Sequence, residues 1–450
     1  MLPRLRPRKF YDLVIQVAIV RPGPIQGDMV HPYLRRRDGL DEVDYPNDAI
    51  REVLERTLGV PIFQEQVIKL AMVAAGFTAG EADRLRRAMA AWKSTGDLTP
   101  FRDKLITGML ARGHGRSFAE RLYRQICGFG GYGFPESHSA SFALLVYVSS
   151  WIKHHHPEAF YCALLNSQPM GFYSPSQLVQ DARRHQVDIQ PIDINFSQWE
   201  HTIENNHTRL RLGFCLVKGL SRNGAQEIVA QRPPGGYQTI EQLRDLATPD
   251  NRDMECLASA NALRSLSQNR HQARWDILGH DTPPPLFSGT SVHDTAGHYI
   301  CEDRRIELTA PSEGEDILED YASHGLTLNR HPLALLREQG HLRFCRTAEQ
   351  LKRDTPGRPV QVSGLVTGRQ RPGSASGVTF VTLEDETGNV NVVVWLDTAR
   401  QQRQPLLKAR LLHVKGIIER EGDIVHIMAG KLTDLSHLLG NLNIHSRDFH

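Results

Sequence analysis

The sequence predicts a multidomain α+β protein: a helical N-terminal region, then a helix-hairpin-helix region, then a C-terminal OB-fold β-barrel. Three observations predict this class. Apolar residues recur at helical spacing up to about residue 165. Short apolar runs alternate with glycine turns between about 205 and 275. From residue 358 onward, β-rich runs suggest about five strands in roughly 75 residues, which is typical of a small barrel.

Length and composition describe an ordinary globular chain. Its 450 residues are enough for roughly two to four domains. The formal net charge is only +2, so an acidic partner would have to be bound by local basic patches. The six cysteines are scattered without a C-x-x-C pair, which disfavours zinc ribbons and thioredoxin-like sites and fits a reduced cytoplasmic protein.

No segment of the sequence reads as a membrane or secretion signal. The N-terminal run MLPRLRPRKFYD is basic but lacks the apolar core of a secretory signal. The longest apolar stretch, about 140–152, is too short and too rich in serine to span a bilayer. We therefore expect a cytoplasmic location and no membrane partner.

The helical region, 1–165, is expected to contain several amphipathic helices. Residues 49–77 carry the helical pattern with a break at Gly59 and Pro61. Thr78 precedes Glu81 by three residues, which is a capping-box pattern at the start of the next helix. Residues 139–167 read as one or two buried helices with a break at Pro157.

The rest of the chain divides by composition. Residues 166–275 are expected to form a connecting segment and the helix-hairpin-helix domain, and 276–315, rich in Pro, Ser, Thr and Gly, a linker. A helical connector is expected over 316–357, the barrel over 358–435, and a tail over 436–450.

The basic helix DRLRRAMAAWK is the first candidate site. Arg86 and Lys93 lie seven residues apart and share a helix face, and Arg87 lies about a quarter-turn away. Several cations near a capped helix start can hold a polyphosphate. A solvated basic face is the alternative interpretation, and the residues alone leave both open.

The glycine cluster GFGGYGFPESHSASFA, residues 128–143, is the second candidate. Glycine weakens helices and strands, so a cluster indicates a bend or a close approach to another group. Its aromatic residues could stack on a base and His138 could donate to a phosphate. A tight helix–helix turn capped by Ser-His-Ser is the alternative, since neither a G-x-G-x-x-G nor a P-loop pattern is present.

The segment LVKGLSRNGAQEIV resembles half of a helix-hairpin-helix, whose hairpin amides and a nearby cation grip a DNA phosphate. Ser221 takes the place of the second hairpin glycine, while Lys218, Arg222 and the Gly224 turn are retained. A purely structural hairpin remains the alternative.

The barrel offers a third set of candidates, and metal sites are not expected. Arg369, Arg371 and Phe380 suit single-stranded DNA, whereas Trp395 is expected in the core. The run HHH at 154–156 points its rings about 100° apart, which argues against one shared ion. The only acid in QPIDIN is a single aspartate, and EDE at 384–386 is expected to be a solvated turn.

These segments, in this order, resemble the C-family bacterial DNA polymerases, the relatives of the polymerase III alpha subunit. Residues 17–30 are similar to the family's fingers segment with R-P-G-P, and PIFQEQVIKLA to its Y-Q-E-Q stretch. DRLRRAM is similar to its L-R-R-A-M helix, and GGYGFPESHSASFALL to its G-Y-G-F-x-x-S-H-S-A segment. QPIDIN and LNRHPL are similar to its P-x-D-I-N and G-H-P elements. The resemblance covers nearly the whole chain and is closest to the error-prone branch.

The resemblance implies a set of roles. The fingers residues near the incoming nucleotide would be Arg21, Arg86, Arg87, Tyr132 and His138. The family's palm motif P-D-x-D-x-D-F and its N-terminal PHP domain are missing. The chain is therefore expected to be the C-terminal part of a polymerase, with no catalytic residue and no metal ligand of its own, because Mg²⁺ belongs to the palm carboxylates of the complete enzyme.

The expected function is the fingers, helix-hairpin-helix and OB part of an error-prone DNA-directed DNA polymerase used in damage tolerance and translesion synthesis. Expected partners are primer–template DNA and deoxynucleoside triphosphates. Binding to a sliding clamp or to other damage-tolerance proteins stays open, because no convincing short clamp peptide is present. The alternative is a non-catalytic DNA-binding module built from the same domains.

Overall fold

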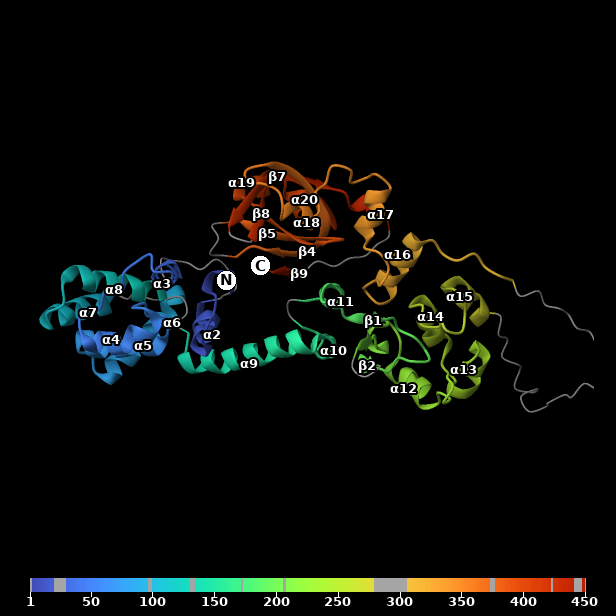
Figure 1. The fold of residues 1–450 in the computed structure, drawn as a ribbon, viewed down its shortest axis with the longest axis horizontal. Coiled ribbons are helices and arrows are strands. Elements are labelled where there is room, and N and C mark those ends of the chain that lie inside the picture. The colour runs from blue at the N-terminus through green and yellow to red at the C-terminus, as the bar shows by residue number, and fades with distance from the viewer. Residues whose placement is uncertain are drawn as a thin grey trace, which may run out of the picture. The chain divides into compact units, whose positions relative to one another are not determined.

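The computed structural model describes residues 2–19, 30–95, 99–129, 134–170, 173–204, 208–278, 306–372, 377–421, 424–440 and 447–449. These residues form two compact units, 1–151 with 371–377 and 152–370 with 378–450 (Figure 1). Arg21 and Tyr132, and most of the expected linker 276–315, lie outside the described residues.

The first unit is helical, as expected. One apolar core, with Ile15, Phe63 and Leu70 among its most buried members, gathers the helices of residues 2–129. The predicted break falls between α4 and α5, where Gly59 has a φ of +75°. The predicted cap is present, since Glu81 accepts the Thr78 N–H at 3.0 Å. The helices are α1 (Leu2–Leu5), α2 (Phe10–Ile19), α3 (Val30–Arg37), α4 (Asp48–Leu54), α5 (Gln64–Ala75), α6 (Ala79–Thr95), α7 (Thr99–Ala111), α8 (Arg116–Phe129) and α9 (Glu136–His155).

The second unit begins with a helical domain that contains a small sheet. Its core includes Tyr161, Leu210, Phe214 and Leu257. Strand β3 pairs in parallel with β1 and antiparallel with β2. The elements are α10 (Pro157–Asn166), α11 (Pro175–Arg184), β1 (Asp188–Gln190), β2 (Thr202–Glu204), β3 (Arg209–Arg211), η2 (Phe214–Leu216), α12 (Arg222–Ala230), α13 (Ile240–Ala247), α14 (Asn251–Ser259) and α15 (Arg270–Leu278).

Three short helices connect this domain to the barrel. They are α16 (Glu313–Ser323), α17 (Pro332–Glu338) and α18 (Ala348–Leu351). Helix α16 begins before the expected residue 316 because Ser312 and Glu315 form a capping box. Apolar residues of α16 and α17 share a core with Leu365 and Leu411 of the barrel, so the connector is packed onto the barrel.

The barrel has the expected strands and is closed. The sheet order is β5-β6-β8-β7-β4, and an additional β4–β5 pairing closes the ring. Strands β6 and β8 run parallel and the other barrel pairs run antiparallel. This is an OB-fold. Its elements are β4 (Pro359–Gln370), β5 (Thr379–Asp385), β6 (Gly388–Val394), α19 (Leu396–Gln401), α20 (Arg403–Lys408), β7 (Leu411–Glu421) and β8 (Ile424–Asp434).

Three local expectations differ from the structure. Residues 436–450 do not form a simple tail, because η3 (Ser436–Leu439) follows the barrel and β9 (Arg447–Phe449) pairs in parallel with β4. Trp395 is not in the core but 55% exposed, since it lies at the N-cap of α19 and not inside β6. The EDE run is not a solvated turn, because Glu384 and Asp385 are buried. The Asp385 carboxylate accepts the N–H groups of Ala348, Thr387 and Gly388.

Helix α9 is continuous to His155 and the chain breaks at Pro157 as expected, but the expected burial is wrong. Only Ser139 and Ala143 of α9 are buried. Its large apolar side chains are exposed by 41–59%: Phe142, Leu144, Leu145, Val146, Tyr147, Val148 and Trp151. A helix that is apolar on all sides normally lies inside a larger core, whereas these side chains of α9 are exposed.

Candidate nucleic-acid interface

Arg86 and Arg87 lie together on α6, on either side of one carboxylate. Arg86 donates to Asp83 Oδ1 from Nε at 3.0 Å, and Arg87 Nη2 lies 2.6 Å from Asp83 Oδ2. The two guanidinium groups lower the pKa of Asp83 below its usual range. All three side chains are at least 38% exposed, so the cluster is open to solvent and to an anionic ligand. The side chain of Lys93 is outside what the structure describes.

The two motifs PIFQEQ and GFPESHSA meet in space. Phe63 and Phe134 form a parallel bridge, and the Gln64 N–H donates to the Phe134 carbonyl at 3.2 Å. The Glu136 N–H donates to the Glu65 carboxylate at 3.0 Å, which fixes the first turn of α9 against the first turn of α5. The start of α9 is therefore held on the core of the first unit.

His138 projects from this fixed turn and is exposed. Its ring lies between Phe134 and Phe142, with ring-centre separations of 5.2 and 4.5 Å. An imidazole held between two rings at a helix start can donate to a phosphate while the rings position it. No contact between His138 and either Arg86 or Arg87 is seen among the described residues.

The contacts of Ser221 explain why a serine occupies the position of the second hairpin glycine before α12. Gly219 has a φ of +87°, a conformation that favours glycine. Ser221 is the N-cap of α12, and its hydroxyl accepts the Gly224 N–H at 2.9 Å. The Ser221 N–H and hydroxyl also donate to the buried Asp253 carboxylate at 2.8 and 2.6 Å. The serine thus ties the hairpin to α14.

The two hairpin cations differ in their freedom. Lys218 donates to the carbonyls of Tyr321 and Ala322 at 2.9 and 2.8 Å, and burial lowers its pKa. An ammonium has three donors, so one remains for a phosphate. Arg222 is exposed in the first turn of α12, and its guanidinium lies 5.8 Å from the centre of the Trp199 ring. Arg222 is the more accessible of the two.

The candidate residues of the barrel also differ in how accessible they are. Arg369 is buried, and its guanidinium donates to the Leu406 carbonyl at 2.6 Å and to the Ala409 carbonyl. Arg369 therefore holds the end of α20 against β4, and we do not include it among the residues proposed to contact DNA. Arg371 is exposed just after β4, and Phe380 is partly buried on β5.

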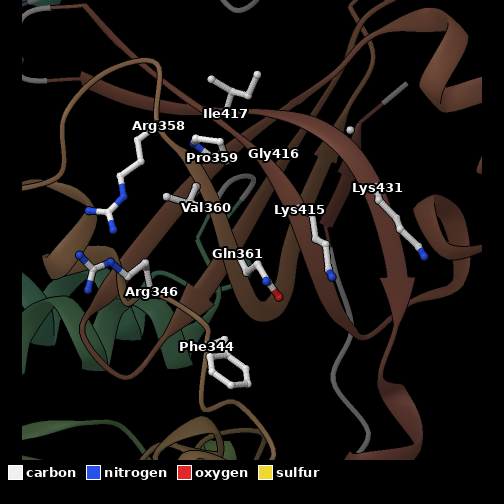
Figure 2. A pocket seen from close by; sticks show the side chains of 11 residues that line it. Phe344, Arg346, Arg358, Pro359, Val360, Gln361, Lys415, Gly416, Ile417 and Lys431 are labelled. Atoms are coloured by element: carbon white, nitrogen blue, oxygen red, sulfur yellow. The ribbon is translucent and has the colours of Figure 1, made fainter.

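A groove on the barrel was missed by the sequence reasoning. It has a volume of about 580 Å³ and lies over β4, β7 and β8 (Figure 2). Lys415 and Lys431 are direct partners across β7 and β8, and Gln361 on β4 is the partner of Lys415. The alternation of Lys415, Ile417 and Glu419 along β7 could have indicated an outward face, but only the strand register shows that two lysines are neighbours. The full lining is Phe344, Arg346, Arg358, Pro359, Val360, Gln361, Lys415, Gly416, Ile417, Gly430 and Lys431.

Within the described part of the chain, no three His, Cys, Asp or Glu side chains are grouped so that they could hold a metal ion. The rings of His154 and His155 pack edge to face, with their centres 4.7 Å apart. Asp193 is buried and accepts from the Asn195 N–H and the Ser265 hydroxyl, which gives it a structural role. Among the helices that the structure describes, none is both long and apolar enough to cross a membrane.

Comparison with known proteins agrees with these domains. Residues 1–113 match the bacterial DNA polymerase III alpha subunit finger domain, 186–273 a helix-hairpin-helix motif, and 360–435 an OB-fold nucleic acid binding domain. A Vibrio parahaemolyticus protein described as an error-prone DNA polymerase is 57% identical over 454 residues, and one from Alkalilimnicola ehrlichii is 58% identical over 453 residues. Each alignment covers 100% of this chain but only 43% of the relative, so the chain spans less than half of the relatives' length.

Proposed function

We propose that this chain, which is 57–58% identical over its whole length to bacterial error-prone DNA polymerases, supplies the fingers and the DNA-binding domains of a polymerase that copies damaged templates. The observation that carries the proposal is the identity of 57–58% over the whole chain, through all three domains. The place of action would be the cytoplasm, where a bacterial polymerase meets its DNA.

The fingers would contact the incoming deoxynucleoside triphosphate through the α6 arginines. Asp83 already orients Arg86 and Arg87, and their exposed guanidinium groups can exchange this carboxylate for a more highly charged triphosphate. His138 at the start of α9 would add a further donor, together with Arg21 and Tyr132, which lie outside the described residues. These contacts bind and orient the nucleotide.

DNA would be held by the other two domains. Arg222 and the remaining donor of Lys218 would contact duplex phosphates at the hairpin. Arg371 and Phe380 would contact a single strand at the barrel. Such contacts position the DNA without reading its base edges, which suits a polymerase that must accept any sequence.

Nucleotidyl transfer needs carboxylate-bound Mg²⁺, and the residues described here do not fit that role. The metal ligands of a complete enzyme would therefore come from the part of the relatives that this chain does not match. We propose that the exposed apolar residues of α9 pack against that same part. Leu144, Leu145 and Tyr147 have large exposed surfaces, and the relatives' additional chain would provide the core that they lack.

A chimera tests this proposal. The matching 43% of the Vibrio parahaemolyticus relative is replaced by this chain, and primer extension is measured. We expect activity in the chimera and none when the replacement carries Leu145→Ser and Tyr147→Ser, although the same substitutions should leave the isolated chain folded because both side chains are exposed there. An inactive, well-folded chimera without substitutions would favour the non-catalytic DNA-binding module instead.

A further inference from the structure

The geometry of the barrel groove points to a binding site for a single-stranded nucleic acid, and we propose that the strand crosses β4, β7 and β8. This inference rests on the proposed function, in which the chain binds DNA, and it names a surface on the barrel for that binding. OB-folds commonly bind on the face of their second and third strands, which here are β5 and β6. The groove lies on the first, fourth and fifth strands, so it is a second surface for single strands, separate from the one that we assign to Arg371 and Phe380.

The lysine pair is the first observation. Lys415 and Lys431 lie directly opposite each other on neighbouring antiparallel strands and are both exposed. Like charges in such a pair repel and destabilise the sheet. Among the residues that the structure describes, no carboxylate pairs with either lysine. An anion placed between them would relieve this repulsion, and a phosphate group has the required charge.

The charge of the whole lining is the second observation. It contains four cations and no carboxylate. Arg346 and Arg358 both lie next to the Asp354 carboxylate, at 2.6 and 3.3 Å, so one acid offsets part of the charge on that side. The two lysines on the opposite side keep theirs (Figure 2). The groove is therefore complementary to a polyanion.

An exposed aromatic ring at the groove is the third observation. Phe344 is 82% exposed, so its ring is open to stacking by a base. Its backbone is held in place on both sides: Arg337 donates to the Leu342 carbonyl at 3.3 Å before it and to the Cys345 carbonyl at 2.6 Å after it, and the Arg346 N–H donates to the Gln361 carbonyl at 2.7 Å. Because the loop is already fixed, little conformational entropy is lost when a base stacks on this ring.

Together these features fit a strand better than an acidic peptide. Lys415 and Lys431 would contact successive phosphates, Phe344 would stack on a base, and Ile417, 49% exposed, would contact a neighbouring base or sugar. An acidic peptide would satisfy the lysines but would leave the flat ring of Phe344 without a stacking partner. The match of 360–435 to an OB-fold nucleic acid binding domain favours the same choice.

The test is the binding of a fluorescein-labelled 16-nucleotide oligo(dT) to the full chain, followed by anisotropy from 50 to 200 mM salt. We expect Phe344→Ala to weaken binding roughly 5- to 150-fold, and Phe344→Tyr to retain it. The Lys415→Ala, Lys431→Ala double variant should reduce the slope of log affinity against log salt by about 1.4. Lys408→Ala, which removes an exposed lysine of α20 outside the groove, is the matched control and should change little.

Three results would overturn the inference, and they differ in what else they affect. If the groove variants bind like the unmodified chain while Arg371→Ala weakens binding, the groove is not the site, but the proposed DNA binding stands. If the unmodified chain binds neither oligo(dT) nor duplex DNA, the proposed function fails as well. If a polyglutamate peptide binds at the lysines and oligo(dT) does not displace it, the groove serves an acidic protein partner.

Discussion

Ser221 and Asp253, 32 residues apart, are joined by two hydrogen bonds of 2.8 and 2.6 Å, which tie the first turn of α12 to α14. Gly224 lies directly beside this pair. A β-carbon at position 224 would lie 2.1 Å from Asp253 Oδ2 and 2.7 Å from Ser221 Oγ, too close for either atom to stay in place. The hairpin therefore depends on a glycine that the sequence shows only as part of a turn.

Gly224→Ala should destabilise the helix-hairpin-helix domain by about 1–3 kcal/mol, because the added methyl group overpacks a partly buried hydrogen-bonded site. Hydrogen exchange of the α12 and α14 amides measures this locally in a chain of several domains. Gly235→Ala is the matched control, since a β-carbon there meets nothing within 4 Å. Equal protection of α12 in both variants would show that the Ser221–Asp253 pair does not hold the hairpin.

Arg86→Ala and Arg87→Ala, made in the active chimera, should each raise the KM for dNTP more than they weaken primer–template binding. Each removes a charge-assisted contact worth roughly 1.5–3 kcal/mol, or about 10- to 150-fold. Arg84→Ala, on the same helix and exposed, should leave the KM unchanged. An unchanged nucleotide dependence in the first two variants would mean that the α6 arginines form only a solvated face.

Acid should destabilise the domain around His201. This side chain is 3% exposed, its Nδ1 accepts the Gly213 N–H at 3.1 Å, and burial lowers its pKa to about 4. The unfolded chain, with a histidine pKa near 6.5, takes up the proton first, so the stabilisation is complete above about pH 6.5 and is lost as the pH falls toward 4. The loss amounts to about 3 kcal/mol.

An NMR titration of the His201 ring checks this pKa directly, and hydrogen exchange of β3 between pH 7 and 4 checks the stability. His201→Gln should remove this part of the pH dependence, whereas His341→Gln, which changes an exposed histidine, should leave it intact. A His201 ring that titrates near 6.5 would contradict the burial that the structure gives it.

The chain alone should not extend a primer with Mg²⁺ and dNTPs, because the described residues group no carboxylates that could hold the catalytic metal. A primer-extension assay with a preparation free of host polymerases is sufficient. Measurable incorporation would show that a metal site has been built from residues to which we assign other roles.

The sequence predicted the elements well and the surroundings of single side chains poorly. The five barrel strands follow from local β-rich runs, and the break at Pro157 follows from proline itself. Whether a side chain is buried depends on residues far away in sequence. Arg369 was assigned to DNA by its charge, yet carbonyls 37 and 40 residues later hold it inside the barrel.

In the candidate site, too, local motifs could be recognised in the sequence, but contacts between distant residues could not. The fingers and hairpin residues could be named because they stand in recognisable local motifs. The Lys415–Lys431 pair could not, because only the β7–β8 register makes the two residues neighbours. Phe344 could not either, since an isolated phenylalanine in a sequence is expected in a core. The apolar run of α9 was predicted correctly as a helix, but its large apolar side chains are exposed and not buried as predicted.

DNA binding by the chain itself is the most direct test of the proposed function, measured by anisotropy with duplex and single-stranded oligonucleotides of unrelated sequence from 50 to 200 mM salt. For duplex DNA, the phosphate contacts of Lys218 and Arg222 predict a slope of log affinity against log salt of about −1.8 or steeper, and hence at least a roughly 12-fold loss of affinity over that range. For single strands, Arg371 and the groove lysines Lys415 and Lys431 predict a slope of about −2.1 or steeper, and hence at least a roughly 18-fold loss. Sequence preference should be weak. No binding at 50 mM, or an affinity that does not depend on salt, would contradict the role of these domains as the DNA-holding part of a polymerase.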